Sequence, residues 1–241
     1  MGSAPDVLVV ATTPALAELY RLTSTIPIVF IQVGDPVESG LVASLARPGG
    51  NITGFQSFDA AIGGKWLGLL KEAAPKMMRV ALLYGSDIPV TVAFLRAAEA
   101  LATSIGVAVT PVDVVGGGGI EQSVAAFSGQ PDGGLIVTPH RYTLANRQSI
   151  IALAARHRLP AMYPLRIFAA KGGLISYGFD VIDQWRGPAT YVDRILRGEK
   201  PGELPVQAPT KYELVVNLKT ANALGLSIPP AFPLRADEVI E

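Results

Sequence analysis

The residues of this sequence that could do chemistry are polar and aromatic side chains that stand directly after apolar runs. Thr12 and Thr13 follow DVLVVA, and Asp35 follows IPIVFIQV. Ligands of parallel sheets bind at the carboxyl ends of strands, so these positions are the ones to search. The candidate ligand-binding residues selected on this basis are Thr12, Thr13, Pro14, Asp35, Ser57, Phe58, Tyr84, Ser86, Asp87, Thr138, His140, Arg141, Tyr142, Tyr163 and Asp180.

The types of these side chains predict binding of a small zwitterionic or aromatic solute. Thr12 and Thr13 precede a predicted helix, whose free backbone N–H groups could hold a carboxylate. Asp35 could pair with an ammonium group. The aromatic rings among the candidates could stack on a ring or cover a cation. A mixed polar and aromatic lining of this kind is typical of a small-molecule site.

Several candidates also have a purely structural explanation. Thr13 stands where a helix N-cap is expected, and Asp35 with the following proline forms a turn signal. Tyr84 could close the edge of a core, and Arg141 could be a solvated loop charge. His157 lies at a predicted helix end, where a basic group complements the dipole, so we interpret it as structural.

The sequence contains no motif that supports an enzyme active site or a metal site. The chain has no cysteine and two histidines, His140 and His157, which excludes disulfides, thiolate catalysis, Cys-based metal sites and a His-rich metal site. No G-x-S-x-G elbow, P-loop or strand-following G-x-G-x-x-G occurs. The run Gly116–Gly119 lacks the Lys-Ser/Thr of a P-loop and is interpreted as a loop. We therefore expect a protein that is not an enzyme and uses no cofactor and no metal.

Composition narrows the class further. The 241 residues are 49% hydrophobic and 17% charged, which is too apolar for a disordered chain. Lys plus Arg and Asp plus Glu number 20 each, so no net charge favours nucleic acid or an anionic membrane. The first residues lack the basic segment and long apolar core of a secretory signal, so no signal peptide is expected in this chain.

Strand and helix patterns alternate along almost the whole chain, which predicts βαβ units and parallel sheets. The fold class expected is α/β with two doubly wound parallel-sheet lobes. Residues 1–58 and 180–241 are assigned to lobe 1 and residues 59–179 to lobe 2, with hinges near residues 56–60 and 178–181. The expected strands are 6–11, 26–33, 52–55, 79–84, 107–112, 134–138, 161–163 and 173–177, and the expected helices are 13–22, 39–45, 60–73, 90–105, 120–127, 143–156, 181–197 and 218–224.

The sequence also resembles a known family. The stretches TIPIVFIQVGDPVESGLVASLARPGGNITGF, LIVTPHRYT, GGLISYGFD and LPVQAPTKYELVVNLKTANALGLSIPP are similar to ABC-transporter substrate-binding proteins of the tryptophan/amino-acid-binding kind. The resemblance covers essentially the whole chain from Asp6 onward. It implies a type I periplasmic-binding fold, an interlobe cleft for an amino acid or aromatic acid, ABC permease membrane subunits as partners, and a periplasmic or other extracytoplasmic location.

Carried over position by position, the resemblance implies a pocket made by candidate residues already named, from Thr12 to Asp180. The chain departs from the family at its start. Family members normally have a signal peptide and a first βαβα unit before the strand that matches DVLVVA. Lobe 1 is therefore expected to be incomplete, and the strand edge left open would invite formation of a homodimer. An alternative with the same fold is a ligand-sensing regulatory domain of repressor-effector type, which would follow a basic helix-turn-helix.

Overall fold

The computed structural model describes residues 5–115 and 119–241, and the chain divides into two compact units. Unit 1 consists of Met1–Asp59 and Phe179–Tyr212, and unit 2 consists of Ala60–Gly178 and Glu213–Glu241. The chain therefore passes between the units three times. Each unit has its own sheet and its own core, as expected for two α/β lobes.

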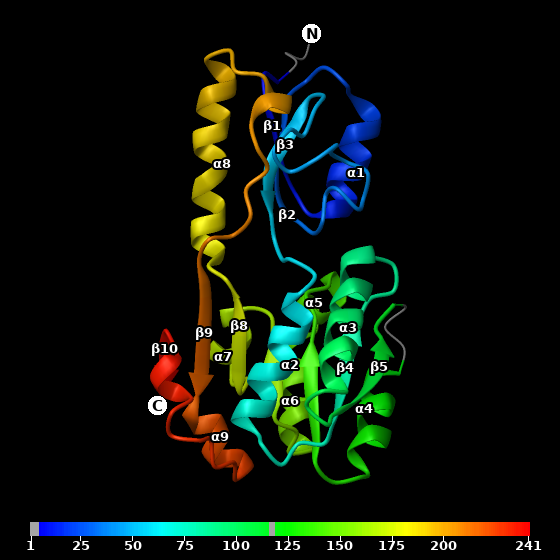
Figure 1. The fold of residues 1–241 in the computed structure, drawn as a ribbon, viewed down its shortest axis with the longest axis vertical. Helices are drawn as coiled ribbons and strands as arrows, with labels where there is room; N and C mark the ends of the chain where they lie inside the picture. Colours follow the sequence, from blue (N-terminus) through cyan, green and yellow to red (C-terminus); the bar gives the residue numbers. More distant parts are fainter. Residues whose placement is uncertain (1–4, 116–118) are drawn as a thin grey trace. The chain divides into compact units, whose positions relative to one another are not determined.

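The sheet of unit 1 has three strands in the order β1-β2-β3, and all three run parallel. One helix, α1, covers one face of this sheet, and a second helix, α8, covers the other (Figure 1). The bounds are Leu8–Ala11 for β1, Ile28–Val33 for β2, Ile52–Gln56 for β3, Thr13–Leu22 for α1 and Val181–Leu196 for α8.

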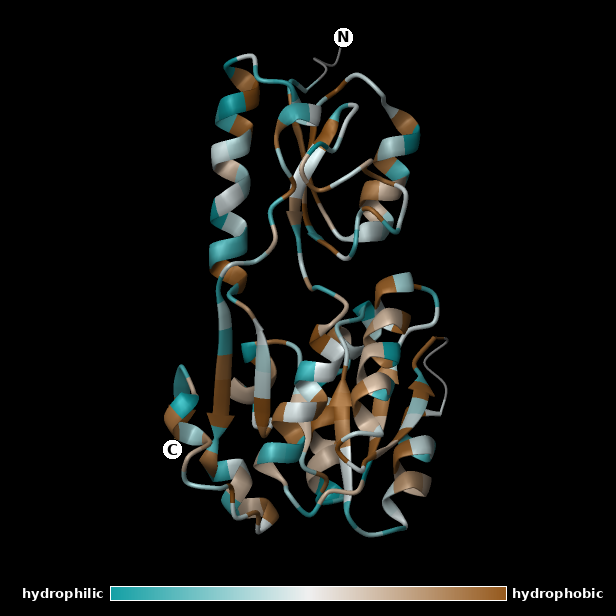
Figure 2. Cartoon of the chain, in the orientation of Figure 1, coloured by the Kyte–Doolittle hydropathy of each residue, from teal (hydrophilic) through white to brown (hydrophobic). Residues whose placement is uncertain are grey.

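Side chains alternate between the two faces of this sheet, as the strand period requires. Ile28 and Phe30 of β2 are buried in the cluster that contains Leu16 of α1. Val29 points the opposite way and is buried against Tyr191 of α8. Because both faces are buried, β2 is the continuous apolar run seen in the sequence, and Figure 2 shows the strands of both units as mostly hydrophobic.

A register shift interrupts β2 shortly before its end. Ile31 pairs with Phe55, and the next pair along the ladder is Val33 with Gln56. Gln32, which is left between them, has φ 53°. The extra residue turns Val33 toward the α1 face, where it joins the core, and it redirects the loop that carries Asp35.

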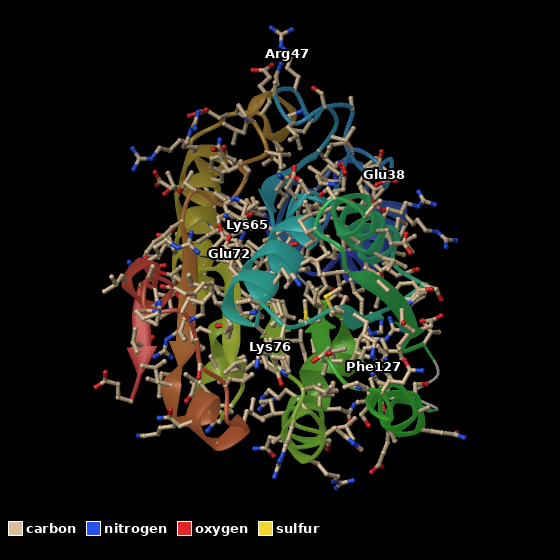
Figure 3. All side chains as sticks on the ribbon, turned by 60° about the horizontal axis from the view of Figure 1, so that its bottom comes forward. Glu38, Arg47, Lys65, Glu72, Lys76 and Phe127 are labelled. Atoms are coloured by element: carbon tan, nitrogen blue, oxygen red, sulfur yellow. The ribbon has the colours of Figure 1, made fainter. Side chains whose placement is uncertain are left out.

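The loop after β2 contains turns where a helix over residues 39–45 was expected, so that expectation was wrong. Its backbone bonds are local, such as Gly40 N–H to Val37 O at 3.0 Å. Gly40 has φ 68°, a left-handed conformation that a right-handed helix cannot contain. Glu38 and Arg47 of this loop are exposed, and the side chain of Arg47 points outward in Figure 3.

The sheet of unit 2 has seven strands in the order β10-β9-β8-β7-β6-β4-β5. Strands β4 to β8 run parallel. Their bounds are Arg79–Tyr84 (β4), Ala108–Asp113 (β5), Gly133–Val137 (β6), Ala161–Tyr163 (β7) and Ile175–Phe179 (β8), with Tyr212–Asn217 (β9) and Glu238–Ile240 (β10) completing the sheet.

Helices cover both faces of this larger sheet (Figure 1). Helices α4 and α6 bury the face that carries Leu83 and Leu135, while α2 and α3 pack together on the other face. The helices are Ile62–Ala73 (α2), Pro89–Ala102 (α3), Ile120–Ser128 (α4), Arg141–Ala145 (α5), Arg147–Arg156 (α6), Arg166–Ala170 (α7) and Leu218–Leu224 (α9), with short 3-10 turns at Pro201–Glu203 and Pro233–Arg235.

The expectation that all of residues 180–241 belong to lobe 1 was wrong for the C-terminal segment. Residues 213–241 belong to unit 2, because β9 and β10 extend its sheet beside β8. Asn217 anchors this return: its N–H donates to Leu174 O at 2.8 Å, and its Nδ2 donates to Ala169 O at 3.0 Å. Local sequence predicted an extended segment here, but only these distant partners decide which sheet receives it.

Strand β9 runs opposite to β8, so the sheet is not parallel throughout. Asn217 bonds Leu174 beyond one end of β8, while the N–H of Asp180 donates to Lys211 O beyond its other end. Residue numbers thus rise along one strand as they fall along the other, which is the antiparallel pattern.

Two smaller differences concern other segments. The helix expected over residues 143–156 is split at Asn146 into α5 and α6. Residues 116–118 of the expected glycine turn lie outside the described residues.

Close packing of α2 on α3 depends on Gly63. Trp66 of α2 meets Phe94 of α3 edge to face, with ring centroids 5.2 Å apart, and its Nε1 donates to Tyr177 O at 2.7 Å. A Cβ at Gly63 would overlap the carbonyl group of Phe94, whereas one at Gly68 would make an ordinary contact 3.6 Å from a Leu101 methyl group. The two glycines of one helix therefore differ in what an added methyl group would do.

We expect Gly63→Ala to lower the free energy of unfolding by about 2 kcal/mol, because the overlap forces α2 away from α3. Gly68→Ala is the matched control, since alanine raises helix propensity by up to about 1 kcal/mol where space allows. Chemical denaturation of both variants checks this. Equal effects of the two substitutions would contradict the proposed packing.

Candidate functional site

The carboxyl end of the sheet in unit 1 concentrates unusual backbone conformations. Thr12 follows β1 with φ 78°, and Gln32 and Asp35, at the end of β2, have φ 53° and 30°. For residues with a Cβ, and above all for a β-branched threonine, these values are costly. Backbone strain of this kind clusters at functional sites. The strained residues therefore lie at the same edge of the sheet that the sequence analysis selected.

Neither Thr12 nor Thr13 caps helix α1 with its side chain. Thr12 is the N-cap residue of α1, but its side chain makes no capping hydrogen bond. Thr13 is the first helical residue, followed by Pro14, and its Oγ1 accepts from Gly34 N–H at 3.3 Å. The capping explanation of Thr13 was therefore wrong. The N-terminus of α1 keeps its positive end without a side-chain acceptor, which suits an anion.

Asp35 and Ser57 follow the two neighbouring strands at this edge. Oδ1 of Asp35 accepts from Glu38 N–H at 2.9 Å, as in an ordinary Asx turn, while Oδ2 has no partner among the described residues. The N–H of Ser57 donates to Val33 O at 2.9 Å, and the residue is buried. Among the described residues, one carboxylate oxygen and one hydroxyl group beside the end of β2 thus have no hydrogen-bond partner.

Phe58 and Asp180, the other candidates of unit 1, are engaged within the unit. The ring of Phe58 is buried, with its centroid 4.7 Å from that of Phe179. Asp180 is the N-cap of α8: Oδ1 accepts from Ile182 N–H at 2.9 Å and from Asp183 N–H at 3.2 Å. Lys211 Nζ lies 2.8 Å from Oδ2. These hydrogen bonds, first that from Lys211, hold the pKa of Asp180 below its usual range.

In unit 2, Asp87, His140 and Arg141 form a hydrogen-bonded network at the carboxyl end of the sheet. His140 is the buried N-cap of α5, and its Nδ1 accepts from Tyr142 N–H at 3.2 Å. Nε2 must then carry the proton, and it donates to Asp87 Oδ1 at 3.0 Å. The exposed Arg141 donates to Asp87 Oδ2 at 2.6 Å. Both carboxylate oxygens of Asp87 are therefore occupied.

Gly85 makes this network possible. A Cβ at this position would lie 2.6 Å from the ring carbon Cδ2 of His140, so only glycine leaves room for the imidazole. The hydroxyl group of Thr91, on α3, donates to Gly85 O and holds the loop from the other side. The loop after β4 is thus held in place by packing and hydrogen bonds.

Asp113 is a residue of this edge that the sequence analysis missed. It ends β5, and its Oδ2 accepts from Ser86 Oγ at 2.5 Å, while Oδ1 accepts from the N–H groups of Ser86 and Val115. Burial by itself would raise the pKa of Asp113, but these three hydrogen bonds lower it below its usual range. The strand-end rule could have found Asp113, had it been applied to β5.

The remaining candidates are mostly buried in the packing of unit 2. Thr138 is fully buried, and its hydroxyl group donates to Leu83 O at 2.8 Å. Tyr163 is stacked on Phe168 with centroids 5.0 Å apart, and burial raises the pKa of its phenol. Tyr142 lines a groove of about 800 Å³ between α4 and α6. Tyr84 is half-buried at the end of β4. Each strand end thus supplies few free polar groups.

Among residues 5–115 and 119–241 we find no group of three or more His, Asp and Glu side chains that could hold a metal ion. The same part of the chain contains no helix long and apolar enough to cross a bilayer. What the strand ends of unit 1 do offer is hydrogen-bonding groups and the uncapped N-terminus of α1, and both can bind a polar solute.

Comparison with known proteins gives a consistent result. A family model described as ABC transporter substrate binding protein matches residues 1–240. Over 222 residues the chain is 24% identical to the curated Tyrosine-binding protein of Clostridioides difficile (strain R20291). That alignment covers 92% of this chain and 63% of the relative, so the chain spans less than two thirds of the length of that protein.

Two solved structures share the fold closely. A conserved domain protein from Vibrio cholerae O1 biovar El Tor superposes with a TM-score of 0.90 at 28% identity, over 98% of this chain and 79% of that one. The ABC domain in complex with L-Trp from Streptococcus pneumonia superposes with a TM-score of 0.89 at 25% identity, again over 98% and 79%. The α/β fold of the type I periplasmic-binding kind, with largely parallel sheets covered by helices, is thereby confirmed, although β9 runs antiparallel in the larger sheet.

We expect Asp180→Ala to lower the free energy of unfolding at pH 7 by about 1 kcal/mol, because α8 loses its cap. The pKa of Asp180 is lowered in the folded state, so its contribution is present above its unfolded pKa of about 3.9 and disappears as pH falls through the folded pKa. Urea titrations between pH 7 and pH 3 should show the difference between wild type and variant shrinking on acidification.

Asp180→Asn is the control for this prediction, since asparagine keeps the cap but cannot pair with the charge of Lys211. We expect its stability at pH 7 to lie between those of wild type and Asp180→Ala. A difference that stays constant from pH 7 to pH 3 would show that the carboxylate charge is not involved.

Proposed function

Because the chain belongs to the ABC transporter substrate-binding protein family, we propose that it is the solute-binding component of an ABC-type importer and that its solute is an amino acid or aromatic acid. The family consists of binding proteins rather than enzymes, in agreement with the motifs absent from the sequence. One relative is named for tyrosine and one similar structure contains L-Trp, which favours an aromatic amino acid. A repressor-type regulator has the same fold but no support from the family match.

The observation that carries this proposal is the carboxyl edge of unit 1. The N-terminus of α1 lacks a side-chain cap, and the backbone there is held at the positive φ of Thr12. A solute carboxylate would complete this helix end, as anions do at other helix N-termini. The free Oδ2 of Asp35 would accept from the solute ammonium group, and the buried Ser57 hydroxyl would supply a further hydrogen bond.

Unit 2 would contribute mainly the rigid loops after β4 and β6. Asp87 is already neutralised by Arg141 and hydrogen-bonded by His140, so it is a weaker candidate for the ammonium partner than Asp35. Positioning by residues locked in networks is the arrangement that lowers the entropic cost of binding. The interlobe cleft and its hinges remain a proposal that rests on the sequence resemblance alone.

Partners and location follow from the same proposal. A solute-binding component must hand its ligand to ABC permease membrane subunits, so it would act in the periplasm or elsewhere outside the cytoplasm. The balanced charge of the chain gives no reason to expect a nucleic-acid partner.

We expect L-tyrosine or L-tryptophan to raise the melting temperature of this chain. A ligand at a hundredfold excess over Kd stabilises the folded state by about 2.7 kcal/mol, which for this length is a rise of roughly 5–10 °C. Thermal-shift measurement with these amino acids, their D-enantiomers and small aromatic acids checks this. The D-enantiomers are the control, because they would misplace the ammonium group. No shift with any of these compounds would contradict the proposed solute class.

Substitution of Ser57 tests the location of the site separately from the solute class. We expect Ser57→Ala to weaken binding roughly 3- to 10-fold through loss of one neutral hydrogen bond, with the melting temperature of the unliganded protein unchanged. Ser44→Ala is the control, since Ser44 Oγ is used in an outer turn with Arg47. Isothermal titration with the solute found above gives both Kd values. Equal values for the two variants would move the site away from β3.

A further inference from the structure

Gln32 adopts a backbone conformation that glutamine rarely takes. It belongs to β2, where the register shift leaves it between Ile31 and Val33, and its φ is 53°. A bulge residue in the left-handed conformation is usually glycine, because a Cβ there crowds the neighbouring carbonyl oxygen. Glutamine at this position therefore costs stability that glycine would restore.

The other described residues with positive φ have a local reason for it. Most of them are glycines, and two are aspartates, a residue type that tolerates this conformation. Arg158 follows α6 and helps to close its C-terminus, since its N–H donates to Ala155 O at 3.1 Å. Thr12 belongs to the proposed solute site. Gln32 alone is a long polar side chain held at positive φ inside a strand.

The amide of Gln32 makes no hydrogen bond that would explain this choice of residue. The side chain is half-buried, and neither Oε1 nor Nε2 has a partner among residues 5–115 and 119–241. Val33, the next residue, provides the contact with the core. Gln184 of the same unit differs, because its Nε2 donates to Gln56 O at 2.6 Å. A strained residue with an unbonded amide indicates a task other than folding.

Gln32 lies between the two strand ends that carry the proposed solute groups. The residue before it, Ile31, accepts at its carbonyl oxygen from Thr12 N–H at 3.1 Å. The residue after it, Val33, accepts from Ser57 N–H at 2.9 Å. The uncapped start of α1 is thus on one side and the Ser57 hydroxyl group on the other. The backbone therefore places this amide within the proposed solute site.

A primary amide matches the two charged groups of an amino acid. Its nitrogen donates hydrogen bonds and its oxygen accepts them. An α-amino acid carries its carboxylate and its ammonium group on one carbon atom, so a single amide can bond to both. An acid that lacks the amino group uses only the donor. Because hydrogen bonds to charged groups are the stronger ones, affinity should depend on this difference.

We propose that Gln32 binds the solute through its amide, with Nε2 donating to the carboxylate and Oε1 accepting from the ammonium group. This rests on the proposed function and narrows it, because the solute is then an α-amino acid rather than an acid without the amino group. Asp35 supplies the charge opposite the ammonium group, and the start of α1 supplies the positive end opposite the carboxylate. Gln32 bridges the two, and binding offsets its backbone strain.

Gln32→Met tests the amide, because methionine keeps the length of the side chain and removes both hydrogen-bonding atoms. We expect it to weaken binding of L-tryptophan or L-tyrosine at least about 10-fold, through loss of two hydrogen bonds to charged groups. Isothermal titration gives Kd. The desamino forms, indolepropionate and hydroxyphenylpropionate, should lose less affinity, so the preference for the amino acid falls. Wild-type affinity in Gln32→Met, or an unchanged preference, would overturn the proposal.

Gln32→Gly tests the strain. We expect it to raise the melting temperature by roughly 2–4 °C, because glycine accepts positive φ, while it weakens binding as strongly as Gln32→Met does. Arg158→Gly is the matched control: it relieves a positive φ at the end of α6, where no candidate residue lies, and should leave Kd unchanged. A lower melting temperature for Gln32→Gly, or an equal loss of affinity in Arg158→Gly, would contradict the role of Gln32.

The wild-type titration separates this inference from the proposed function. If the wild type and the Gln32 variants bind L-tryptophan or L-tyrosine equally well, the proposed function stands and the role of Gln32 is wrong. If the wild type binds only the desamino acids, the function again stands and the inference is overturned. If it binds none of these compounds, the proposed solute class fails, and the role of Gln32 fails with it.

Discussion

Parallel strands need cover on both faces, and this constraint organises the whole chain. Strands β1 to β3 and β4 to β8 run parallel, and helices lie on both faces of each sheet. The strands therefore contain few polar side chains in their interiors, and the buried run from Ile28 to Ile31 of β2 illustrates this. Hydroxyl groups and carboxylates are confined to strand ends. The same constraint that stabilises the fold places the polar groups where a solute can reach them.

The strand-end groups are divided between holding the loops and binding. Asp180 caps α8 and pairs with Lys211, Asp113 holds Ser86, and Asp87 joins Arg141 to a buried histidine. Each of these carboxylates has its oxygens satisfied, so recruiting it to a ligand would break existing hydrogen bonds. The groups left over lie mainly in unit 1, at the uncapped end of α1 and at Asp35. The few strand-end groups that lack a hydrogen-bond partner therefore say more about where a solute would bind than the full set of polar residues does.

Local patterns predicted the elements well because their signals are local. Continuous Val/Ile/Leu runs mark buried strands, and the helices α1 and α8 begin at Thr13 and Val181, as expected from the sequence. The helix expected over residues 39–45 failed because Gly40 adopts φ 68°, which composition does not reveal. The prediction of which sheet receives β9 failed for a different reason. The place of β9 beside β8 depends on the hydrogen bond between Asn217 and Leu174, which are 43 positions apart in the sequence. The strand ends could be selected from sequence, but which of their groups are already paired could not, and the solute-binding roles stay predictions.

Unit 1 combines the smaller sheet with the greater backbone strain. Its sheet has three strands against seven in unit 2, yet the ends of its strands and the loops after them hold Thr12, Gln32 and Asp35 at positive φ. Strained residues persist only where the surrounding structure overdetermines them, so the cover provided by α1, α8 and the Gln207 segment is essential to this edge. An anion bound at the start of α1 would therefore add stability at this strained edge. Binding would then make the strained conformations easier to maintain.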